Sequence, residues 1–279
     1  MIREGTPFRP LPYAQIDWRD QLPVSRQFGD IYYSAADGLG ESSYTFLEGN
    51  RLAQRLSSHE DPVFCIGETG FGTGLNFLLS WRAWQEAGTT RPYLSYLSVE
   101  QHPLSPRDLQ RALDNWPELA PFGRALLAQY PPPLPGRHRL LFQGGAVRLD
   151  LCWGEAGATL QELSEQSPGL VDAWYLDGFA PAKNANMWEA QLLHSVARLS
   201  RPGASASTFT AAGAVRRALV EAGFEVRKEP GYGRKREALR ATFSAAQSAT
   251  PAPAQSPWDL AAVTAPRPPG ALVVGAGLA

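Results

Sequence analysis

The chain has 279 residues, 44% of them hydrophobic and 19% charged, with a formal net charge of -1; this is the composition of one α/β domain with additions. No run of about eighteen apolar residues occurs, and charged residues and prolines interrupt the N-terminus, so we expect no membrane span, no signal peptide and a cytoplasmic location. The two cysteines, Cys65 and Cys152, lie far apart in apolar runs, which predicts small core residues and neither a disulfide nor a metal site.

Residues 1–60 are rich in proline and aromatic side chains. Short strands are predicted at residues 30–34 and 44–47, because β-branched and aromatic residues there are bounded by Asp-Gly and Gly-Asn turns. We therefore predict a β-rich N-terminal extension. It would either pack at the edge of the following domain or form a cap over a ligand.

The next segment joins a strand to a helix through a glycine-rich turn. Residues 62–66 are an apolar run without polar alternation, as in a parallel strand buried on both faces, and a helical pattern covers residues 75–87. Between them stand Glu68, Thr69, Gly70, Phe71, Gly72, Thr73 and Gly74, followed by Leu75 and Asn76. Three alternating glycines let the backbone pass close to a ligand at the N-terminus of a helix.

The identity of that ligand depends on the carboxylate and on the glycine spacing. A dinucleotide site requires Gly-x-Gly-x-x-Gly, and the third glycine would fall at position 75, where the chain has Leu75. An acidic residue before Gly-x-Gly-x-Gly suits S-adenosylmethionine, because Glu68 can bind its cationic amino group and no pyrophosphate needs a cradle. A tight turn without any ligand is the alternative interpretation.

Acidic residues follow three further predicted strands. The strand at residues 93–99 ends at Glu100, which would lie over the ligand crevice and accept both ribose hydroxyls, unless it is a solvated loop residue. The strand at 147–152 is followed by Glu155, where an adenine contact is expected. The strand at 171–176 delivers Asp177 to the same rim.

The remaining elements alternate between helices and strands. Residues 103–130 look helical with proline interruptions, and later predictions are helices at 187–199 and 214–222 and strands at 204–209, 224–227 and 237–243. The predicted fold is thus α/β, with a Rossmann-like seven-stranded sheet whose last strand is antiparallel. That is the sheet of class I S-adenosylmethionine-dependent methyltransferases.

The C-terminal tail changes composition abruptly. We divide the chain into the extension at 1–60, the methyltransferase domain at 61–245 and a Pro/Ala/Ser-rich linker at 246–269. Residues 270–279 then form an apolar strand entering a turn with Gly275 and Gly277, which predicts the start of an FAD-binding domain.

With these segments placed, residues 5–245 resemble the methyltransferase half of the bifunctional tRNA 5-methylaminomethyl-2-thiouridine biosynthesis proteins, the MnmC family. The resemblance is carried by residues 68–77, by Leu176-Asp177-Gly178-Phe179-Ala180-Pro181-Ala182-Lys183-Asn184 and by Gly233-Arg234-Lys235-Arg236-Glu237. The chain departs from the family pattern at Glu155, Asn186 and Ala204. The resemblance also implies that the tail leads into an FAD-dependent oxidase domain.

The resemblance implies methyl transfer from S-adenosylmethionine to the primary amine of 5-aminomethyl-2-thiouridine at the tRNA wobble position. Asp177 is then expected to accept a hydrogen bond from the substrate ammonium and to take or relay its proton, with the Gly178 carbonyl as a second acceptor. Phe179 would stack on the uracil ring or serve as a core aromatic. Lys183 would touch an RNA phosphate or remain solvated.

Residues 216–240 hold eight Lys or Arg against four Glu in a chain that is otherwise acidic. Such an excess suits a polyanion such as tRNA, although charge runs are commonly solvated surface. The predicted RNA contacts in this stretch are Arg216, Arg217, Arg234, Lys235 and Arg236.

Three other functions stay open at this point. The chain could be a class I methyltransferase acting on a small-molecule or protein amine. It could be a flavin-binding module, an interpretation that rests on Gly275 and Gly277 alone. It could also be a scaffold that binds the cofactor without catalysis.

Overall fold

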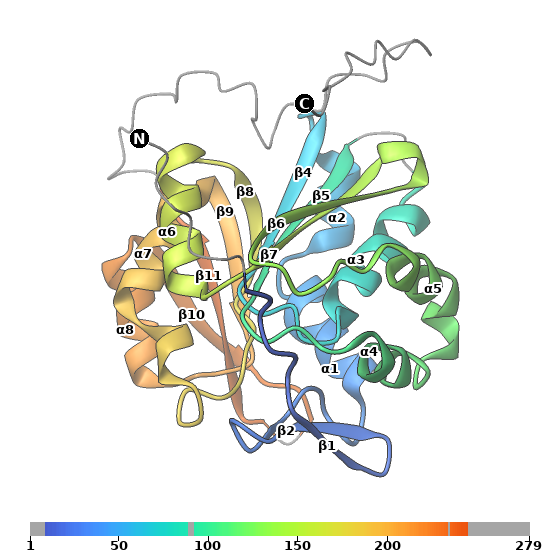
Figure 1. Cartoon of the computed structure of the whole chain (residues 1–279). Coiled ribbons are helices and arrows are strands. Elements are labelled where there is room, and N and C mark those ends of the chain that lie inside the picture. Colours follow the sequence, from blue (N-terminus) through green and yellow to red (C-terminus); the bar gives the residue numbers. More distant parts are fainter. Residues whose placement is uncertain (1–8, 89–91, 234, 245–279) are drawn as a thin grey trace, which may run out of the picture.

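A computed structural model describes residues 9–88, 92–233 and 235–244. The predicted linker at 246–269, the predicted FAD-binding start at 270–279 and Arg234 therefore lie outside the described residues. The architecture is a central β-sheet with helices on both faces and a small second sheet at one end (Figure 1).

The central sheet has eight strands in the order β10-β11-β9-β8-β4-β5-β7-β6. They are β4 Val63–Glu68, β5 Tyr93–Glu100, β6 Gly136–Phe142, β7 Val147–Trp153, β8 Val171–Tyr175, β9 Ser200–Thr208, β10 Phe224–Pro230 and β11 Glu237–Phe243. The five strands from β7 to β9 are parallel, whereas β11 is antiparallel to both of its neighbours and β6 is antiparallel to β7. A parallel sheet ending in an antiparallel hairpin confirms the predicted class I methyltransferase fold.

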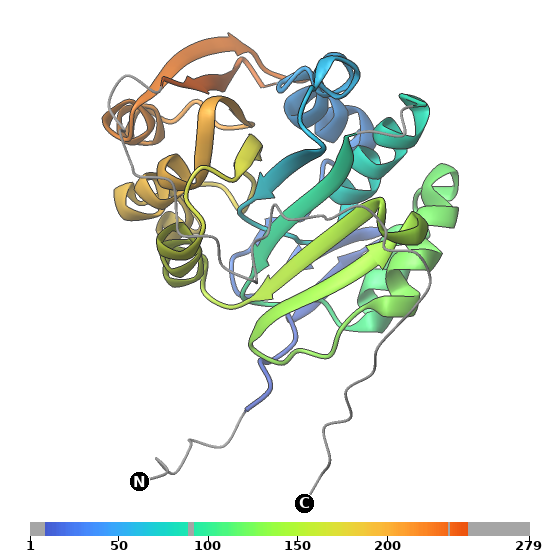
Figure 2. The same ribbon diagram turned by 90° about the horizontal axis from the view of Figure 1, so that it is seen from above.

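Helices cover both faces of this sheet (Figure 2). They are α1 Gly38–Ser42, α2 Leu52–Ser58, α3 Leu75–Glu86, α4 Pro106–Leu113, α5 Ala120–Gln129, α6 Ala156–Gln166, α7 Ala190–Leu199 and α8 Gly213–Glu221, with a π-helix η1 Ser43–Glu48 and 3-10 turns η2 Pro117–Leu119, η3 Gln143–Gly145 and η4 Ala185–Trp188. One hydrophobic core joins the sheet to α2, α3, α4 and α5, and a second joins it to α6, α7 and α8. The central strand β4 is buried along its whole length because both cores enclose it.

The structure differs from the sequence predictions at one edge of the central sheet and in the N-terminal extension. The sheet has eight strands where seven were predicted, because β6 was missed. Only Leu140 and Phe142 of that edge strand are buried, so it lacks the apolar pattern on which the prediction depends. Residues 44–47 belong to the π-helix and not to a strand, since Phe46 must stack on Tyr175 of β8 at a centroid distance of 5.3 Å.

The bounds of one helix and of the strand that follows it also differ from the predicted ones. The helix predicted at 187–199 divides into η4 and α7, and β9 begins at Ser200, so that Pro202 and Gly203 lie inside the strand instead of before it. The predicted closing hairpin is confirmed, with Phe224 opposite Phe243 and Pro230 opposite Glu237.

The N-terminal extension forms the second sheet, from β1 Ile16–Arg19, β2 Leu22–Ser25 and β3 Asp30–Ile31. It lies at the lower end of the molecule in Figure 1, beside α1 and α4. The Trp18 indole donates to Asp108 of α4 over 3.0 Å, and the Arg111 guanidinium lies 4.1 Å from the Trp18 ring centroid. These contacts hold the extension against the end of the sheet where ligands bind in α/β folds.

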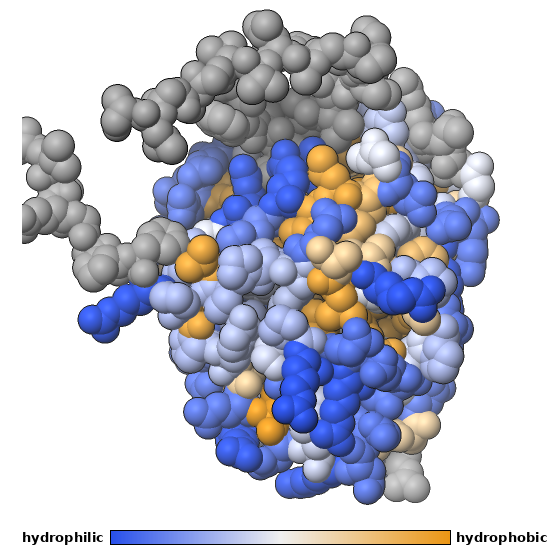
Figure 3. Space-filling view, turned by 45° about the vertical axis from the view of Figure 1, so that its right-hand side comes forward, coloured by the Kyte–Doolittle hydropathy of each residue, from blue (hydrophilic) through white to orange (hydrophobic). Residues whose placement is uncertain are grey.

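The outer surface is mostly polar. On the side of α4 and α5, apolar side chains gather in a band between polar ones (Figure 3). Within the described ranges, no helix has both the length and the apolar character that crossing a bilayer requires.

Candidate active site

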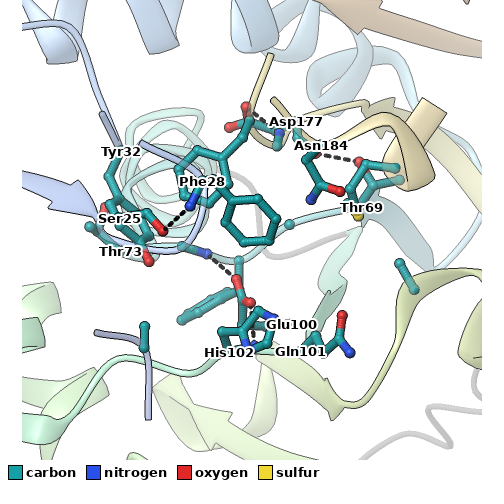
Figure 4. A pocket seen from close by; sticks show the side chains of 18 of the residues that line it. Ser25, Phe28, Tyr32, Thr69, Thr73, Glu100, Gln101, His102, Asp177 and Asn184 are labelled. Carbon is teal, nitrogen blue, oxygen red and sulfur yellow. Dashed lines mark hydrogen bonds between the residues drawn. The ribbon is translucent and has the colours of Figure 1, made fainter. Parts of the chain in front are cut away.

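A cavity enclosing about 960 Å³, part of it open to solvent, lies where β4, β5 and β8 end (Figure 4). The glycine turn after β4 contributes Thr69, Gly70, Phe71, Gly72 and Thr73, and α3 adds Leu75 and Asn76. Val99, Glu100, Gln101 and His102 come from the end of β5, and Asp177, Gly178, Phe179, Asn184 and Met187 from the segment after β8. The extension and η1 region close the cavity with Ala14, Gln15, Ser25, Gln27, Phe28, Ile31, Tyr32 and Ser42.

The glycine turn owes its shape to two residues in the left-handed region. Gly72 has φ 52° and Gly74 has φ 71°, values that residues with a Cβ adopt at a cost. A Cβ on Gly70 would meet the Asp177 carbonyl oxygen at 3.3 Å, so the turn also passes close to the segment after β8. Because Gly70 has no side chain, the glycine turn after β4 can lie against the backbone of the segment after β8.

Glu100 is fixed at the floor of the turn. Its carboxylate accepts the Gly72 N–H over 3.0 Å and the His102 N–H over 2.7 Å. Burial raises the pKa of this carboxyl, and the two backbone hydrogen bonds oppose that rise. Two acceptor oxygens held at the end of the second parallel strand suit a ligand diol.

Glu68, Asn76 and Asp177 form a polar cluster at the cavity wall, in which Glu68 and Asn76 are buried and Asp177 is partly exposed. The Asn76 Nδ2 donates to Glu68 Oε1 over 2.9 Å and to Asp177 Oδ2 over 2.7 Å, and Ser98 Oγ donates to the other oxygen of Glu68 over 2.7 Å. Burial, and secondarily the charge of Asp177, raise the pKa of Glu68 to about 8. Burial also raises the pKa of Asp177 to about 6, although hydrogen bonds from Gly178 and Asn76 oppose it. At neutral pH the cluster thus holds a protonated Glu68 beside a largely ionised Asp177.

The amide oxygen of Asn76 is a further acceptor in this polar cluster. Among the described residues this buried Oδ1 has no hydrogen-bond partner, although Asn76 lines the cavity. A buried acceptor without a donor is costly, so this site suits a ligand that carries an N–H group. A cationic amine satisfies the amide oxygen and is attracted by the Asp177 carboxylate.

Aromatic rings surround the mouth of the cavity beside Asp177. The Phe179 ring lies 4.8 Å from Phe28 and 5.1 Å, edge-on, from Tyr32, and its backbone carbonyl accepts the Trp188 indole N–H over 3.0 Å. The Ala180 N–H donates to the Asp30 carboxylate of β3 over 3.1 Å. The extension therefore orders the segment that follows Asp177, in addition to covering the ligand space.

The predicted cofactor residues are mostly gathered here, with three exceptions. Glu68 is only 1% exposed and reaches the cavity through Asn76, and Gly74 supports the turn from behind, where a Cβ would meet the Phe71 ring at 2.8 Å. The Glu155 carboxylate caps α6 by accepting the N–H groups of Gly157 and Ala158 over 2.8 and 2.7 Å. The neighbouring Ala156, and not Glu155, lines the cavity.

The predicted RNA residues come from three separate segments of the chain. Lys183 is exposed after the Phe179 segment, and Arg216 and Arg217 are exposed on α8. Lys235 pairs with Glu41 over 2.5 Å and lies 4.5 Å from the Phe209 ring centroid, whereas Arg236 is exposed. Arg234 lies outside the described residues.

Several cavity residues were not predicted from the sequence, among them Phe28, Tyr32, Gln101 and His102. Gln101 and His102 directly follow Glu100, so their position after a strand was the available signal. Phe28 and Tyr32 had no local signal beyond the aromatic richness of the first 60 residues. Only the packing of the extension brings them to the cavity.

Comparison with known proteins agrees with this geometry. A family described as S-adenosyl-L-methionine-dependent methyltransferase matches residues 117–244. The bifunctional tRNA 5-methylaminomethyl-2-thiouridine biosynthesis protein MnmC of Pseudomonas aeruginosa (strain UCBPP-PA14) is 49% identical over 269 residues, covering 96% of this chain and 40% of that protein. The protein of the same description from Aeromonas salmonicida (strain A449) is 51% identical over 229 residues, covering 81% of this chain and 34% of that protein.

A solved structure supports the fold independently. The crystal structure of MNMC2 from Aquifex aeolicus superposes with a TM-score of 0.64 at 22% identity, covering 89% of this chain and 75% of that one. The sheet order, the glycine turn and the matching family define a class I S-adenosylmethionine-dependent methyltransferase. Within that class, the chain corresponds to the methyltransferase part of the MnmC family. It spans about 40% of the length of those relatives.

Proposed function

We propose that this chain transfers the methyl group of S-adenosylmethionine to the primary amine of 5-aminomethyl-2-thiouridine at the wobble position of tRNA, giving 5-methylaminomethyl-2-thiouridine. The observation that carries the proposal is the partly exposed Asp177 carboxylate, which lines the cavity between the glycine turn and Phe179. The modified nucleoside is the one in the name of the relatives that match 96% of this chain, the tRNA 5-methylaminomethyl-2-thiouridine biosynthesis proteins.

The cavity residues fit the cofactor. The unpartnered Asn76 Oδ1 is the acceptor for its amino group, with the carboxylate of Asp177 nearby. Glu100 is the acceptor for the ribose hydroxyls, and Gly70 and Gly72 place the backbone of the turn at the cavity wall. The cofactor supplies an electrophilic methyl carbon on a positively charged sulfur. The remaining tasks, which are orientation of the amine and removal of its proton, fall to this chain.

Asp177 performs those two tasks in the proposal. Because its pKa is raised only to about 6, the carboxylate is largely ionised at neutral pH and can accept a hydrogen bond from the substrate ammonium. Because an ammonium nitrogen has no lone pair, Asp177 first takes one of its protons and passes it to solvent. The freed lone pair would then bond to the methyl carbon supplied by S-adenosylmethionine, whose sulfur would keep the electron pair of the broken carbon–sulfur bond. Asn76 and the Gly178 N–H each donate to this carboxylate and hold its oxygens in place.

Phe179 provides the surface for the uracil ring in this proposal. Its ring is supported by Phe28 and Tyr32 of the extension, and its main chain by Trp188. A flat ring held this way can stack on a base with little loss of side-chain entropy. Stacking beside Asp177 aims the exocyclic amine toward the carboxylate.

The partner and the cellular context follow from the same proposal. tRNA is the substrate, which places the enzyme in the cytoplasm. The FAD-dependent step of the bifunctional relatives belongs, in this proposal, to the part of them that this chain does not span.

The test is methyl transfer in vitro from labelled S-adenosylmethionine to tRNA that carries 5-aminomethyl-2-thiouridine, followed by mass spectrometry of the nucleosides. We expect label in 5-methylaminomethyl-2-thiouridine with the 279-residue chain and none when tRNA already carries the methylated nucleoside. A parallel reaction with small polyamines and with protein extracts tests the alternative amine substrates. Cofactor binding without label in the tRNA, or label only in those parallel reactions, would refute the proposal.

A further inference from the structure

The hairpin of β10 and β11 has one covered face and one open face. Phe224, Leu239 and Phe243 pack into the core beneath α8. The alternate residues of both strands belong to the opposite face of the sheet. The helices α7 and α8 lie on the other side of the hairpin (Figures 1 and 2). A groove of about 960 Å³, partly open to solvent, lies between this open face and residues 49–55.

Four arginines line this groove, namely Arg51, Arg55, Arg227 and Arg240, and we call it the arginine groove. Glu225 and Glu229 are the acidic residues among its lining side chains, which leaves an excess of positive charge in a chain with a net charge of -1. The basic stretch of the sequence is therefore divided, with Arg227 and Arg240 in the groove and Arg216 and Arg217 on α8.

Arg227 and Arg240 stand directly opposite each other on adjacent antiparallel strands. Like charges in that position repel each other and destabilise a sheet. Within the described ranges, neither forms an ion pair. Glu225 and Glu229, two residues before and after Arg227 on β10, pair with neither arginine. An anion bound between the two guanidinium groups would relieve this repulsion.

The two other arginines frame the groove from residues 49–55. Arg55 is fixed, because it donates to the Asp172 carbonyl over 2.9 Å and to Ser205 Oγ over 2.5 Å and lies 5.1 Å from the Phe64 ring centroid. Arg51 is exposed, and its side chain has no hydrogen bond or ion pair in the described part of the chain. Its φ of 52° lies in the left-handed region, which a residue other than glycine enters at a cost.

The groove lies one short helix away from the active-site cavity. Ser42, at the start of η1, lines the cavity, and Gly49, just past its end, lines the groove. Between them, the Tyr44 hydroxyl donates to the Pro230 carbonyl over 3.0 Å. The Arg240 guanidinium lies 5.4 Å from the centroid of the Tyr44 ring. The η1 segment therefore links the wall of the cavity to the wall of the groove.

We propose that the arginine groove binds the phosphate backbone of the tRNA whose wobble base occupies the cavity; this inference rests on the proposed function. Guanidinium groups bind phosphates in a bidentate manner, and unpaired arginines along a groove are typical of a backbone-binding surface. The groove supplies affinity and register. Asp177 and Phe179 supply the chemistry and the base contact.

The test variant is Arg51→Asn with Arg227→Gln, since these two exposed arginines make no side-chain contacts in the described structure that folding requires. Asn accepts the left-handed conformation at position 51. The control is Arg124→Gln with Arg198→Gln, two exposed arginines on α5 and α7 whose replacement removes the same charge outside the groove. tRNA binding is measured by filter retention between about 50 and 200 mM salt, with cofactor affinity measured by calorimetry.

We expect the groove variant to bind tRNA roughly tenfold more weakly at about 100 mM salt, with the slope of log K against log salt smaller by about 1.5. The KM for tRNA should rise in parallel, and the cofactor affinity should match that of the wild type and of the control. The control should keep both tRNA affinity and salt slope. Inorganic phosphate should compete only weakly, because a single phosphate occupies one of several contacts.

The outcomes separate this inference from the proposed function. If the wild type methylates tRNA but the groove variant binds it like the control, the groove is not the RNA surface and the inference is wrong. If the control loses as much affinity as the groove variant, overall charge carries the binding and the inference is also wrong. Failure of the wild type to methylate or bind tRNA refutes the proposed function, and the groove then has another partner, such as an acidic protein segment.

Discussion

The side-chain amide of Asn76 donates to the carboxylate of Asp177 over 2.7 Å and, from the same nitrogen, to Glu68 over 2.9 Å. The two acids thus share one donor, with Glu68 buried and Asp177 partly exposed at the cavity. Two carboxylates so placed cannot both ionise easily, and the pKa of Glu68, at about 8, stands above that of Asp177, at about 6. The cluster therefore keeps one acid neutral and the other available as an acceptor at the reacting edge of the cavity.

Replacing Asp177 by Asn should retain cofactor binding and lower the single-turnover rate by about two to four powers of ten, the range for a removed general base. Asn keeps the shape and one acceptor but cannot take the proton. Rapid-quench methylation gives the rate and calorimetry gives the affinity. Asp114→Asn, an exposed site at the end of α4, is the matched control. Near-wild-type methylation by Asp177→Asn across about pH 6 to 9 would make Asp177 a structural residue.

The single-turnover rate should depend on pH through Asp177. The carboxylate must be ionised to act, so the rate should rise with pH and level off above the pKa of about 6. Replacing Asn76 by Leu removes a hydrogen bond that lowers this pKa, so the midpoint of the profile should move to higher pH.

The control for that profile is Asn184→Leu, a change in the same cavity at a residue without a hydrogen bond to Asp177 in the described structure. Its midpoint should stay near that of the wild type when the cofactor is saturating. An unmoved midpoint in Asn76→Leu would show that Asn76 does not tune the acid.

Glu68 should make the ligand-free protein less stable as pH rises. Its folded pKa, about 8, lies above the ordinary 4.5, so the folded state binds the proton more tightly than the unfolded state. The stabilisation is complete below about pH 4.5 and is lost as pH rises to about 8, with a slope of at most about 1.4 kcal/mol per pH unit. Urea unfolding at a series of pH values measures it.

Glu68→Gln keeps the size of the neutral acid and should flatten this slope between about pH 5 and 8. Asp177 is retained in that variant, so any slope below about pH 6 that belongs to it should remain. Equal slopes in wild type and variant would mean that Glu68 ionises normally in the folded protein.

Replacing Gly72 by Val should abolish cofactor binding. Position 72 has φ 52°, and a Cβ there would lie 3.4 Å from the Tyr32 ring, so a branched side chain enters the ligand space as well as straining the turn. Gly144→Val is the control, since its φ is 65° and a Cβ there has no atom within 4 Å. Both variants should lose about 1–2 kcal/mol of stability from the left-handed backbone. Only Gly72→Val should lose binding in calorimetry; similar affinities in both would place the cofactor away from the turn.

The elements nearest the chemistry could be predicted from the sequence because their signals are local. The apolar run of β4, the glycines at 70, 72 and 74 and the helical pattern of α3 are adjacent in the chain, and the parallel sheet then brings Glu100 and Asp177 to the same edge. Strand direction and spacing suffice for that, since the carboxyl ends of parallel strands meet.

Tertiary packing decided what local patterns could not. Residues 43–48 carry strand-forming aromatics yet form a π-helix, because Phe46 packs on Tyr175 and Asn50 bonds across to Ser207. The edge strand β6 needs only one apolar face, so its sequence shows little of the pattern.

Tertiary packing also decided the roles of individual side chains. Glu68 was expected to touch the cofactor, but the fold buries it behind Asn76, and the Glu155 carboxylate is used by the first turn of α6. Phe28 and Tyr32 reach the cavity only because the extension folds against α4. Opposite faces of one hairpin separate Arg227 from Arg216, residues that the sequence places in a single basic stretch. Residue types and spacing along the chain thus determined which backbone segments form the site, whereas contacts between distant segments decided which way each side chain faces and whether its charge is buried.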